Sequence, residues 1–162
     1  ENGNEIMEEG EIGQILLKGP QVFMEYQNLP EKTQASFKDG WFLTGDVAVL
    51  ENGYYRLLGR DSIDIIKSGG YKISALEIED VLLKHKNVKE CAVVGKDDNK
   101  WGEIVVAAII PKNKTISEEE LQNWCSKYLS DYKIPRIIKF LDGLPKNSMG
   151  KVTKKDLKNI FS

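Results

Sequence analysis

The 162-residue sequence is poor in the residues that build disulfide frameworks and zinc sites. It has two cysteines, Cys91 and Cys125, a single histidine and no Cys-x-x-Cys pair. We therefore expect no metal site and a reducing environment. No apolar run approaches the roughly 20 residues that a membrane-spanning helix needs, so we expect no transmembrane segment.

Neither positive nor negative side chains are in large excess. The net charge is −2 and 41% of the residues are hydrophobic, which excludes a disordered chain. Residues 1–59 hold 4 basic and 10 acidic residues, whereas residues 60–162 hold 19 and 15. This asymmetry fits two differently solvated surfaces, or an anionic ligand bound by the second part. The basic excess is too small to predict a nucleic-acid partner.

The beginning of the chain has no initiator methionine and no basic-then-apolar leader. The segment from Glu1 to Glu11 carries five glutamates, and we interpret it as a turn or a hairpin tip. We expect the chain to be a piece of a longer protein.

Residues 1–59 have an all-β pattern. The segment from Ile12 to Gly19 is typical of a strand. Two further apolar runs, 46–50 and 54–58, flank Asn52-Gly53, and this dipeptide strongly favours a β-hairpin.

From residue 60 onward the pattern is mixed. Runs at 63–66 and 71–73 bracket the tight turn Ser68-Gly69-Gly70. Two helices are predicted to begin at Ser74 and Ser117, each with a glutamate three residues later that completes a capping box. The apolar positions at helical spacing are Ile78, Val81, Leu82 and His85 in the first helix, and Leu121, Trp124, Cys125, Tyr128 and Leu129 in the second.

Three more strands and a last helix complete the pattern. Runs 91–94 and 104–110 lack alternation, so both faces of these strands are expected to be covered. A third run covers 137–141, and Thr153 is expected to open a short helix with Leu157, Ile160 and Phe161 on one side. The fold class is therefore α+β, with helices packed on a small sheet.

The first stretch that carries chemistry is Gly40–Asp46, GWFLTGD. An aspartate that follows a glycine and enters a strand presents a carboxylate from a fixed backbone, and a carboxylate can accept two hydrogen bonds from the hydroxyls of a ribose. For Asp46 taken alone, the end of a turn is the simpler interpretation.

The second stretch is Gly59–Lys72, at the boundary in charge and composition. Its small polar residues suit a hinge, and Gly69-Gly70 allows a thin ligand to approach closely. Lys67 and Lys72 can meet phosphates. An ordinary Gly-Gly hairpin with solvated lysines is an equal alternative for this segment alone.

The third stretch is Leu144–Thr153, with Gly150-Lys151 near its end. The phosphate-loop pattern GxxxxGK[ST] requires a glycine where this sequence has Pro145, and no Ser or Thr follows Lys151 directly. We therefore reject a phosphate loop. What remains is a lysine on a polar loop, next to a glycine that lets the ammonium group reach an anion. For this segment alone, a solvated loop lysine is the simpler interpretation.

Other polar residues have simpler interpretations. His85 is expected to be a half-buried packing residue, and Cys125 an inert core residue. Glu103 can orient a nearby lysine or arginine, although an exposed strand start is the simpler interpretation. The sequence offers no nucleophile–base–acid set.

Taken in order, these segments resemble the adenylate-forming acyl-CoA synthetase superfamily. The resemblance rests on GWFLTGD, on GR followed by a Gly-Gly turn and ALEIE, on YKIPR, and on LPKNSMGK, and it extends from about Ile12 to Phe161. The segment IDIIKSGGYKISALEIE is most similar to the malonyl-CoA synthetase branch.

The resemblance implies a two-step reaction. A carboxylic acid reacts with Mg-ATP to give an acyl-adenylate and pyrophosphate, and coenzyme A then displaces AMP. By the family pattern Asp46 and Arg60 bind the ribose of ATP, and Lys151 stabilises negative charge during adenylation. The implied coenzyme A-binding residues are Lys67, Ser68, Gly69, Gly70, Tyr71 and Lys72.

The resemblance also implies the domain organisation. Residues 1–59 correspond to the β-rich end of a large N-terminal domain, and residues 60–162 to a small mixed α/β lid that rotates about a hinge at Asp61 or Ser62. The position two after the arginine is Ser62, where many relatives have Asp or Lys. The family's phosphate loop, its magnesium-binding glutamate and its acyl pocket lie upstream of this chain, so we expect this chain alone to be not fully active.

Two alternatives remain open. The activated acyl group can pass to a carrier protein instead of coenzyme A, or the chain can be a non-catalytic interaction module. A coenzyme A-dependent ligase is expected inside the cell, in the cytoplasm or the mitochondrial matrix, with the acid, ATP and coenzyme A as its small-molecule partners.

Overall fold

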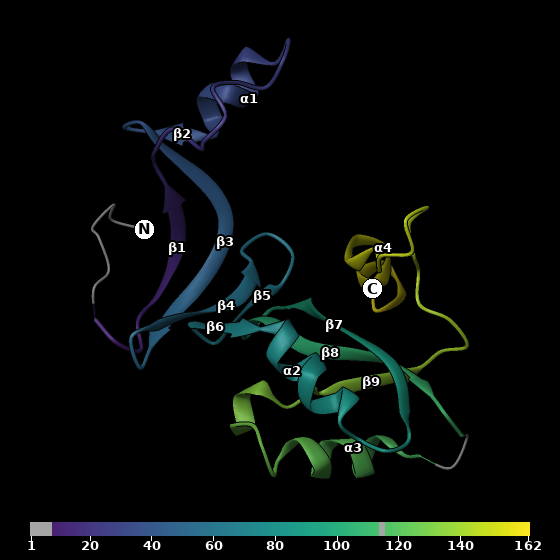
Figure 1. Cartoon of the computed structure of the whole chain (residues 1–162). Helices are drawn as coiled ribbons and strands as arrows, with labels where there is room; N and C mark the ends of the chain where they lie inside the picture. The colour runs from purple at the N-terminus through teal and green to yellow at the C-terminus, as the bar shows by residue number, and fades with distance from the viewer. Residues whose placement is uncertain (1–7, 114–115) are drawn as a thin grey trace. The chain divides into compact units, whose positions relative to one another are not determined.

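The computed structural model describes residues 8–113 and 116–162, and the chain divides into two compact units, Glu1–Ser62 and Ile63–Ser162 (Figure 1). The division falls three residues after the predicted boundary, and strand β4 (Tyr54–Arg60) extends one residue past that boundary. Most of the acidic opening, residues 1–7, lies outside the described residues. The described remainder includes a turn in which Glu11 N–H donates to Glu8 O.

The first unit is built on an antiparallel sheet. Its strands are β1 (Ile12–Leu17), β2 (Phe37–Lys38), β3 (Trp41–Glu51) and β4 (Tyr54–Arg60), in the order β1-β3-β2 with β4 paired to β3. The β3–β4 hairpin turns at Asn52-Gly53, both left-handed at φ 52° and 77° as a type I′ turn requires. The predicted hairpin is thus confirmed.

The prediction that this part is entirely β is wrong at one place. Helix α1 (Pro30–Ala35) lies between β1 and β2, with proline at its start and Glu31 in its first turn. It has no buried residue, so no apolar periodicity marks it in the sequence. Four rings pack near it, with centroids 4.8–5.7 Å apart: Phe23, Tyr26, Phe37 and Phe42.

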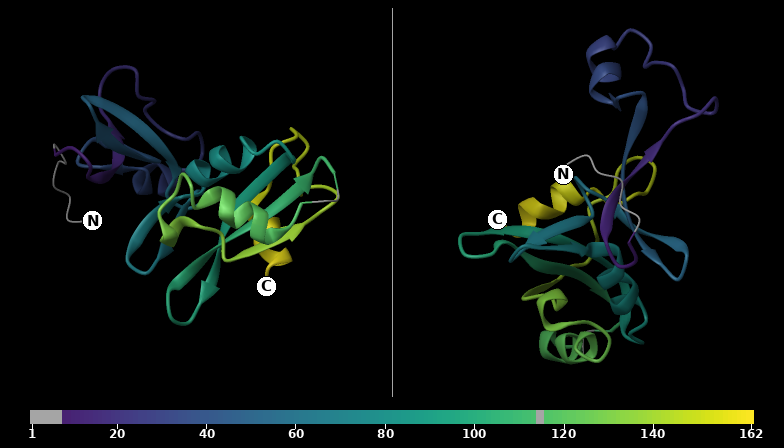
Figure 2. Two further views of the ribbon diagram at one scale, coloured as in Figure 1. Left: turned by 90° about the horizontal axis from the view of Figure 1, so that it is seen from below. Right: turned by 90° about the vertical axis from the view of Figure 1, so that its left-hand side faces the viewer.

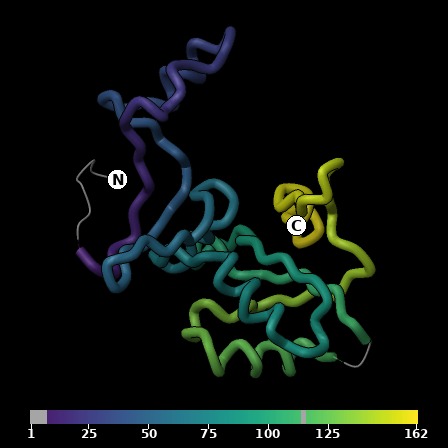
Figure 3. Tube along the Cα trace, in the orientation of Figure 1, coloured from purple at the N-terminus to yellow at the C-terminus, as the bar shows by residue number. Residues whose placement is uncertain are grey.

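The second unit contains a five-stranded sheet. Its strands are β5 (Ile65–Ser68), β6 (Tyr71–Ser74), β7 (Val88–Asp98), β8 (Gly102–Pro111) and β9 (Ile137–Phe140). The order is β6-β5-β8-β7, and β9 pairs in parallel with β8. Figure 3 follows the chain through this unit. The helices are α2 (Ala75–Leu83), α3 (Glu118–Cys125), the 3₁₀ turn η1 (Asp131–Lys133) and α4 (Lys154–Ile160).

Helices cover both faces of this sheet, as the lack of alternation predicted. Along β8, Val105, Ala107 and Ile109 join the core under α2 and α3, whereas the residues between them join the core under α4. The sheet therefore lies between α3 on one side and α4 on the other (Figures 1 and 2). Leu157 and Phe161 close the second core from the α4 side.

Both predicted helix caps are present. Ser74 Oγ accepts from Glu77 N–H at 3.2 Å, and Ser117 Oγ accepts from Glu120 N–H at 3.1 Å. Both helices are shorter than their apolar periodicity suggests. After Cys125 the chain continues in turns, in which the N–H groups of Tyr128 and Leu129 donate to Cys125 O. None of the helices in the described ranges has the length and apolar character needed to cross a membrane.

We predict that Leu157→Ala destabilises the second unit by about 2–5 kcal/mol, because it leaves a cavity under α4. Leu157 is fully buried. Leu83→Ala is the matched control, since Leu83 is 49% exposed and the change leaves no cavity. Denaturant unfolding measures both, and equal losses would contradict the assigned role of Leu157 in this core.

We also predict that the two thiols are unreactive in the folded chain. Burial raises the pKa of Cys91 to about 12 and that of Cys125 to about 11, so both stay protonated at mildly alkaline pH. Iodoacetamide should label neither cysteine in the native chain and both in denaturant, as mass spectrometry would show. Rapid native labelling of Cys125 would contradict its place in the core.

Candidate functional site

The predicted ribose-binding residues are neighbours across two strands. Asp46 on β3 lies directly opposite Arg60 on β4, with Arg60 Nε 3.3 Å from Asp46 Oδ1. Their side chains are 40% and 60% exposed, so both remain open to a ligand. The arrangement presents a carboxylate acceptor that a guanidinium group holds in place.

A bulge fixes the backbone of Asp46. The strand was expected to begin at Asp46, but β3 already begins at Trp41 and includes most of the GWFLTGD segment. In the pairing of β1 with β3, the three residues Thr44, Gly45 and Asp46 lie opposite the single residue Ile15. Gly45 has φ 78°, a conformation that favours glycine. Thr44 Oγ1 donates to Ile15 O at 2.8 Å and accepts from Asp46 N–H at 3.0 Å. The threonine of the TGD motif therefore ties the bulge together.

In the second unit, the Gly-Gly segment is a two-residue hairpin. Gly69 and Gly70 both have positive φ, 58° and 85°, and Ser68 pairs with Tyr71 at the end of the ladder. One step further in, Lys67 lies opposite Lys72, and both are exposed. Two positively charged side chains therefore lie side by side near the end of the hairpin.

Aromatic rings support this hairpin, although no motif in the sequence marks them as site residues. The rings of Tyr71 and Tyr132 stack at 4.4 Å. Gly69 N–H donates to Trp101 O at 2.8 Å, and a Cβ on Gly69 would lie 3.0 Å from the Trp101 ring. The guanidinium of Arg136 lies 4.9 Å from the centre of the same ring. The YKIPR segment contains Tyr132 and Arg136, but its spacing gives no sign of these ring contacts.

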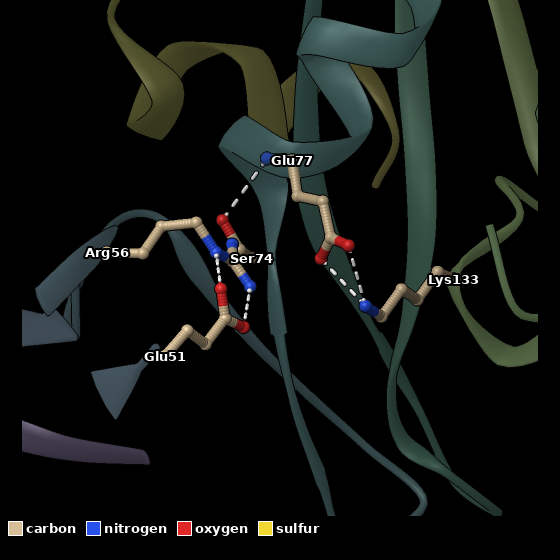
Figure 4. A network of polar contacts seen from close by, with 5 residues as sticks. All are labelled: Glu51, Arg56, Ser74, Glu77 and Lys133. Carbon is tan, nitrogen blue, oxygen red and sulfur yellow. Dashed lines mark hydrogen bonds and ion pairs between the residues drawn. The ribbon is translucent and has the colours of Figure 1, made fainter. Parts of the chain in front are cut away.

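An ion pair holds the YKIPR segment on helix α2. Lys133 Nζ lies 2.8 Å from both carboxylate oxygens of Glu77, whose N–H is also bonded to the Ser74 cap (Figure 4). The side chains are 20% and 28% exposed, so water screens the pair only in part. This pair keeps Tyr132, the residue that precedes Lys133, against Tyr71.

Lys151 lies on a loop that Asn147 closes. Asn147 Oδ1 accepts from the N–H groups of Met149 and Lys151, both at 3.0 Å, and Asn147 N–H donates to Lys151 O. Lys146 Nζ anchors the loop to Glu90 on β7 at 2.6 Å, and this hydrogen bond lowers the pKa of Glu90. The Lys151 side chain is exposed, and its ammonium group contacts no acidic partner in the described parts of the chain.

Glu103 contacts a nearby lysine, as the first of its two interpretations proposed, and is not merely an exposed strand start. Its carboxylate accepts from Lys67 N–H at 2.8 Å and from Lys158 Nζ at 2.9 Å. Gly95 makes room for it, because a Cβ there would lie 2.5 Å from the Glu103 carboxyl carbon. Glu103 therefore joins the Gly-Gly hairpin to helix α4.

His85 is more deeply buried than the expected half, with 5% of its surface exposed. Nε2 lies 3.4 Å from Glu120 Oε1, and the ring meets Trp124 edge to face at 5.1 Å. It is a packing residue, as predicted. Across residues 8–113 and 116–162, no group of three His, Cys, Asp or Glu side chains has the geometry to hold a metal ion.

Comparison with known proteins gives a consistent result. Residues 77–151 match the sequence model of the family described as AMP-binding enzyme C-terminal domain. The mitochondrial malonate–CoA ligase of Bos taurus is 46% identical over 147 residues, which are 90% of this chain, and the malonate–CoA ligase of Arabidopsis thaliana is 49% identical over 160 residues, 91% of this chain.

Solved structures are similar as well. ATP-bound MatB from Rhodopseudomonas palustris is similar, with a TM-score of 0.85 and 36% identity. The match covers 99% of this chain and 32% of the MatB chain. The o-succinylbenzoate CoA synthetase of Bacillus subtilis, in complex with its acyl-adenylate, matches 98% of this chain and 32% of its own, with a TM-score of 0.87 and 40% identity.

The chain spans about a quarter of the length of the curated relatives it matches, 25% of the bovine and 26% of the plant protein. The matched family model covers most of the second unit, from helix α2 to the Lys151 loop. The chain therefore belongs to the adenylate-forming acyl-CoA synthetase superfamily, and residues 77–151 are its AMP-binding enzyme C-terminal domain.

Proposed function

We propose that this chain is the C-terminal part of an AMP-forming acyl-CoA synthetase, in which Lys151 promotes adenylation of a carboxylic acid. The observation that carries the proposal is the exposed Lys151 side chain, presented by a loop that Asn147 closes through hydrogen bonds from Met149 N–H and Lys151 N–H. The matched family and the malonate–CoA ligases among the relatives support the same reaction class.

Adenylation brings two anions together. A carboxylate oxygen of the acid forms a bond to the α-phosphorus of ATP, and the bond from that phosphorus to the pyrophosphate oxygen breaks. An ammonium group between the reactants offsets their repulsion and the charge that grows on the phosphate oxygens. Magnesium supplies charge neutralisation to ATP when bound, but the residues described here form no site for it, so its ligands are expected outside this chain.

Asp46 and Arg60 are the proposed ribose site. The Asp46 carboxylate has two oxygens, and the ion pair with Arg60 involves Oδ1. The carboxylate can therefore accept hydrogen bonds from ribose hydroxyls while Arg60 keeps it oriented. The Thr44 bonds hold its backbone at the bulge, so little further ordering is needed when the nucleotide binds.

Thioester formation is assigned to the β5–β6 hairpin. The sulfur of coenzyme A bonds to the acyl carbonyl carbon, AMP leaves, and the thiol proton is lost. Gly69-Gly70 offers a backbone without side chains along which a thin pantetheine chain can pass. Ser68 and Tyr71 flank the turn, and the opposed Lys67 and Lys72 would meet the phosphates of coenzyme A.

The hinge is assigned to Asp61-Ser62. Asp61 N–H donates to Gly45 O at 3.0 Å, which ties Asp61 to the first unit. The division between the compact units follows Ser62, so Ser62 is the favoured pivot. Rotation there would bring Lys151 to ATP for the first step and the Gly-Gly hairpin for the second.

The acid is proposed to be short, with malonate favoured because the curated relatives include malonate–CoA ligases. Transfer to a carrier protein is the alternative acceptor reaction, and a thioester assay with coenzyme A against a carrier would separate the two. An intracellular compartment, the cytoplasm or the mitochondrial matrix, is proposed; several relatives are named as mitochondrial.

We predict that Lys151→Ala, in the complete protein that carries this chain, lowers acid-dependent ATP–pyrophosphate exchange by about 10²–10³-fold, as for other groups that stabilise transition-state charge. Thioester formation from supplied acyl-adenylate should persist. Lys155→Ala is the control, since Lys155 is an exposed lysine of α4. Unchanged exchange would refute the role of Lys151, and no exchange in the unsubstituted protein with any acid would favour the non-catalytic alternative.

We predict that Asp46→Ala raises the apparent KM for ATP by about tenfold or more, because a hydrogen bond to a charged group contributes about 1.5–3 kcal/mol. Glu51→Ala is the matched control. Glu51 pairs with Arg56 on the same two strands, and its side chain is 43% exposed, so this change removes a comparable carboxylate. An unaltered dependence on ATP would remove the ribose assignment.

A further inference from the structure

Helix α4 begins with a lysine that is almost buried. Lys154 has 11% of its side chain exposed, and its Nζ lies 2.8 Å from Asp64 Oδ1 and 2.9 Å from Glu79 Oε1. Both carboxylates are also largely covered, at 15% exposure. One ammonium group thus bridges two carboxylates inside the second unit.

Backbone bonds tie the two carboxylate residues into the fold. Glu79 Oε1 also accepts from Val93 N–H on β7 at 2.8 Å, so Lys154 is connected through Glu79 to both α2 and the central sheet. Asp64 O accepts from Ala75 N–H at the start of α2, also at 2.8 Å. The cluster therefore joins the start of α4, helix α2, strand β7 and the segment that precedes β5.

Stability alone does not account for this cluster. Removing charges from water costs several kcal/mol per ion, and well-packed apolar residues often replace a buried ion pair without loss of stability. The cluster also carries two negative charges against one positive charge. A lysine at the first position of a helix is further disfavoured by the helix dipole. What the cluster does provide is a fixed place for the ammonium group, because Lys154 Nζ lies within ion-pair distance of both carboxylates, although neither contact has hydrogen-bond geometry.

The place of the cluster in the chain relates it to the proposed function. Lys154 follows Lys151 by three residues, and Asp64 follows Ser62 by two. Thr153 N–H donates to Pro145 O at 2.9 Å, which closes the base of the Lys151 loop directly beside Lys154. The base of the loop is thus linked to the segment next to the proposed pivot through one side chain.

We infer that Lys154 is a positioning residue for adenylation: its ion pairs with Asp64 and Glu79 fix the base of the Lys151 loop relative to the segment that follows the hinge. The inference rests on the proposed function and adds to it a residue that does not touch the substrate. Rotation at Ser62 is then transmitted through a rigid connection to the Lys151 ammonium group.

The test compares the two half-reactions in the complete protein. We expect Lys154→Met to lower acid-dependent pyrophosphate exchange by about 10²-fold, the effect of a displacement of about 1 Å at a reacting group. The KM for ATP and thioester formation from supplied acyl-adenylate should stay near their unsubstituted values. Lys154→Arg should restore much of the exchange, because it keeps a cation at the bridge.

Two further variants control for folding. Lys155→Met changes the neighbouring exposed lysine of α4 and should leave both half-reactions unchanged. Glu79→Gln keeps the shape of the side chain and an oxygen for the Val93 N–H but loses the charge that faces Lys154. It should lower exchange in the same selective way, and it decides the question if Lys154→Met does not fold.

Several results would overturn the inference. Full exchange in folded Lys154→Met or in Glu79→Gln, while Lys151→Ala is inactive, would remove the positioning role and leave the proposed function intact. An equal fall in both half-reactions would make the cluster merely structural. No acid-dependent exchange in the unsubstituted protein would overturn the proposed function itself, and this inference with it.

Discussion

The second unit depends on strand β8 being buried on both faces at once. Its alternate residues enter two separate cores, one under α2 and α3 and one under α4. Since apolar side chains fill both faces, the helices have no freedom to leave the sheet without exposing a core to water. The segments that carry polar chemistry can then be short loops, because the layers on either side fix where each loop starts and ends.

Single polar side chains give those loops their shape. Asn147 closes the Lys151 loop through its side-chain oxygen, and Thr44 ties the bulge before Asp46 through its hydroxyl. Glu77 does the same for η1 through its ion pair with Lys133 (Figure 4). Each of these residues leaves the candidate binding group itself exposed, so rigidity and access are supplied by different side chains.

Local patterns in the sequence predicted much of this architecture. The Asn52-Gly53 and Gly69-Gly70 turns, both helix caps and the doubly covered strands all depend on short-range chemistry, and the structure confirms them. Helix α1 was missed because it has no buried residue and therefore no apolar periodicity. The ends of α2 and α3 were predicted too late, because the turns that follow each helix place further apolar residues at helical spacing.

Contacts between distant residues lay beyond prediction from the sequence. The pairing of Asp46 with Arg60 follows from the register of β3 on β4, and an irregularity between Val47 and Ala48 shifts that register. The stacking of Tyr132 on Tyr71, and the bridge from Lys154 to Asp64 and Glu79, join residues many positions apart with no shared periodicity. The division after Ser62 likewise reflects contacts between distant residues, such as the bond from Asp61 N–H to Gly45 O.

Glu103 divides one carboxylate between the amide of Lys67 and the ammonium group of Lys158. In the proposed enzyme these two partners belong to the surfaces that serve successive steps, the coenzyme A hairpin and the helix behind the adenylation lysine. A change at this one acid would disturb both surfaces together, so evolution cannot adjust either step there in isolation.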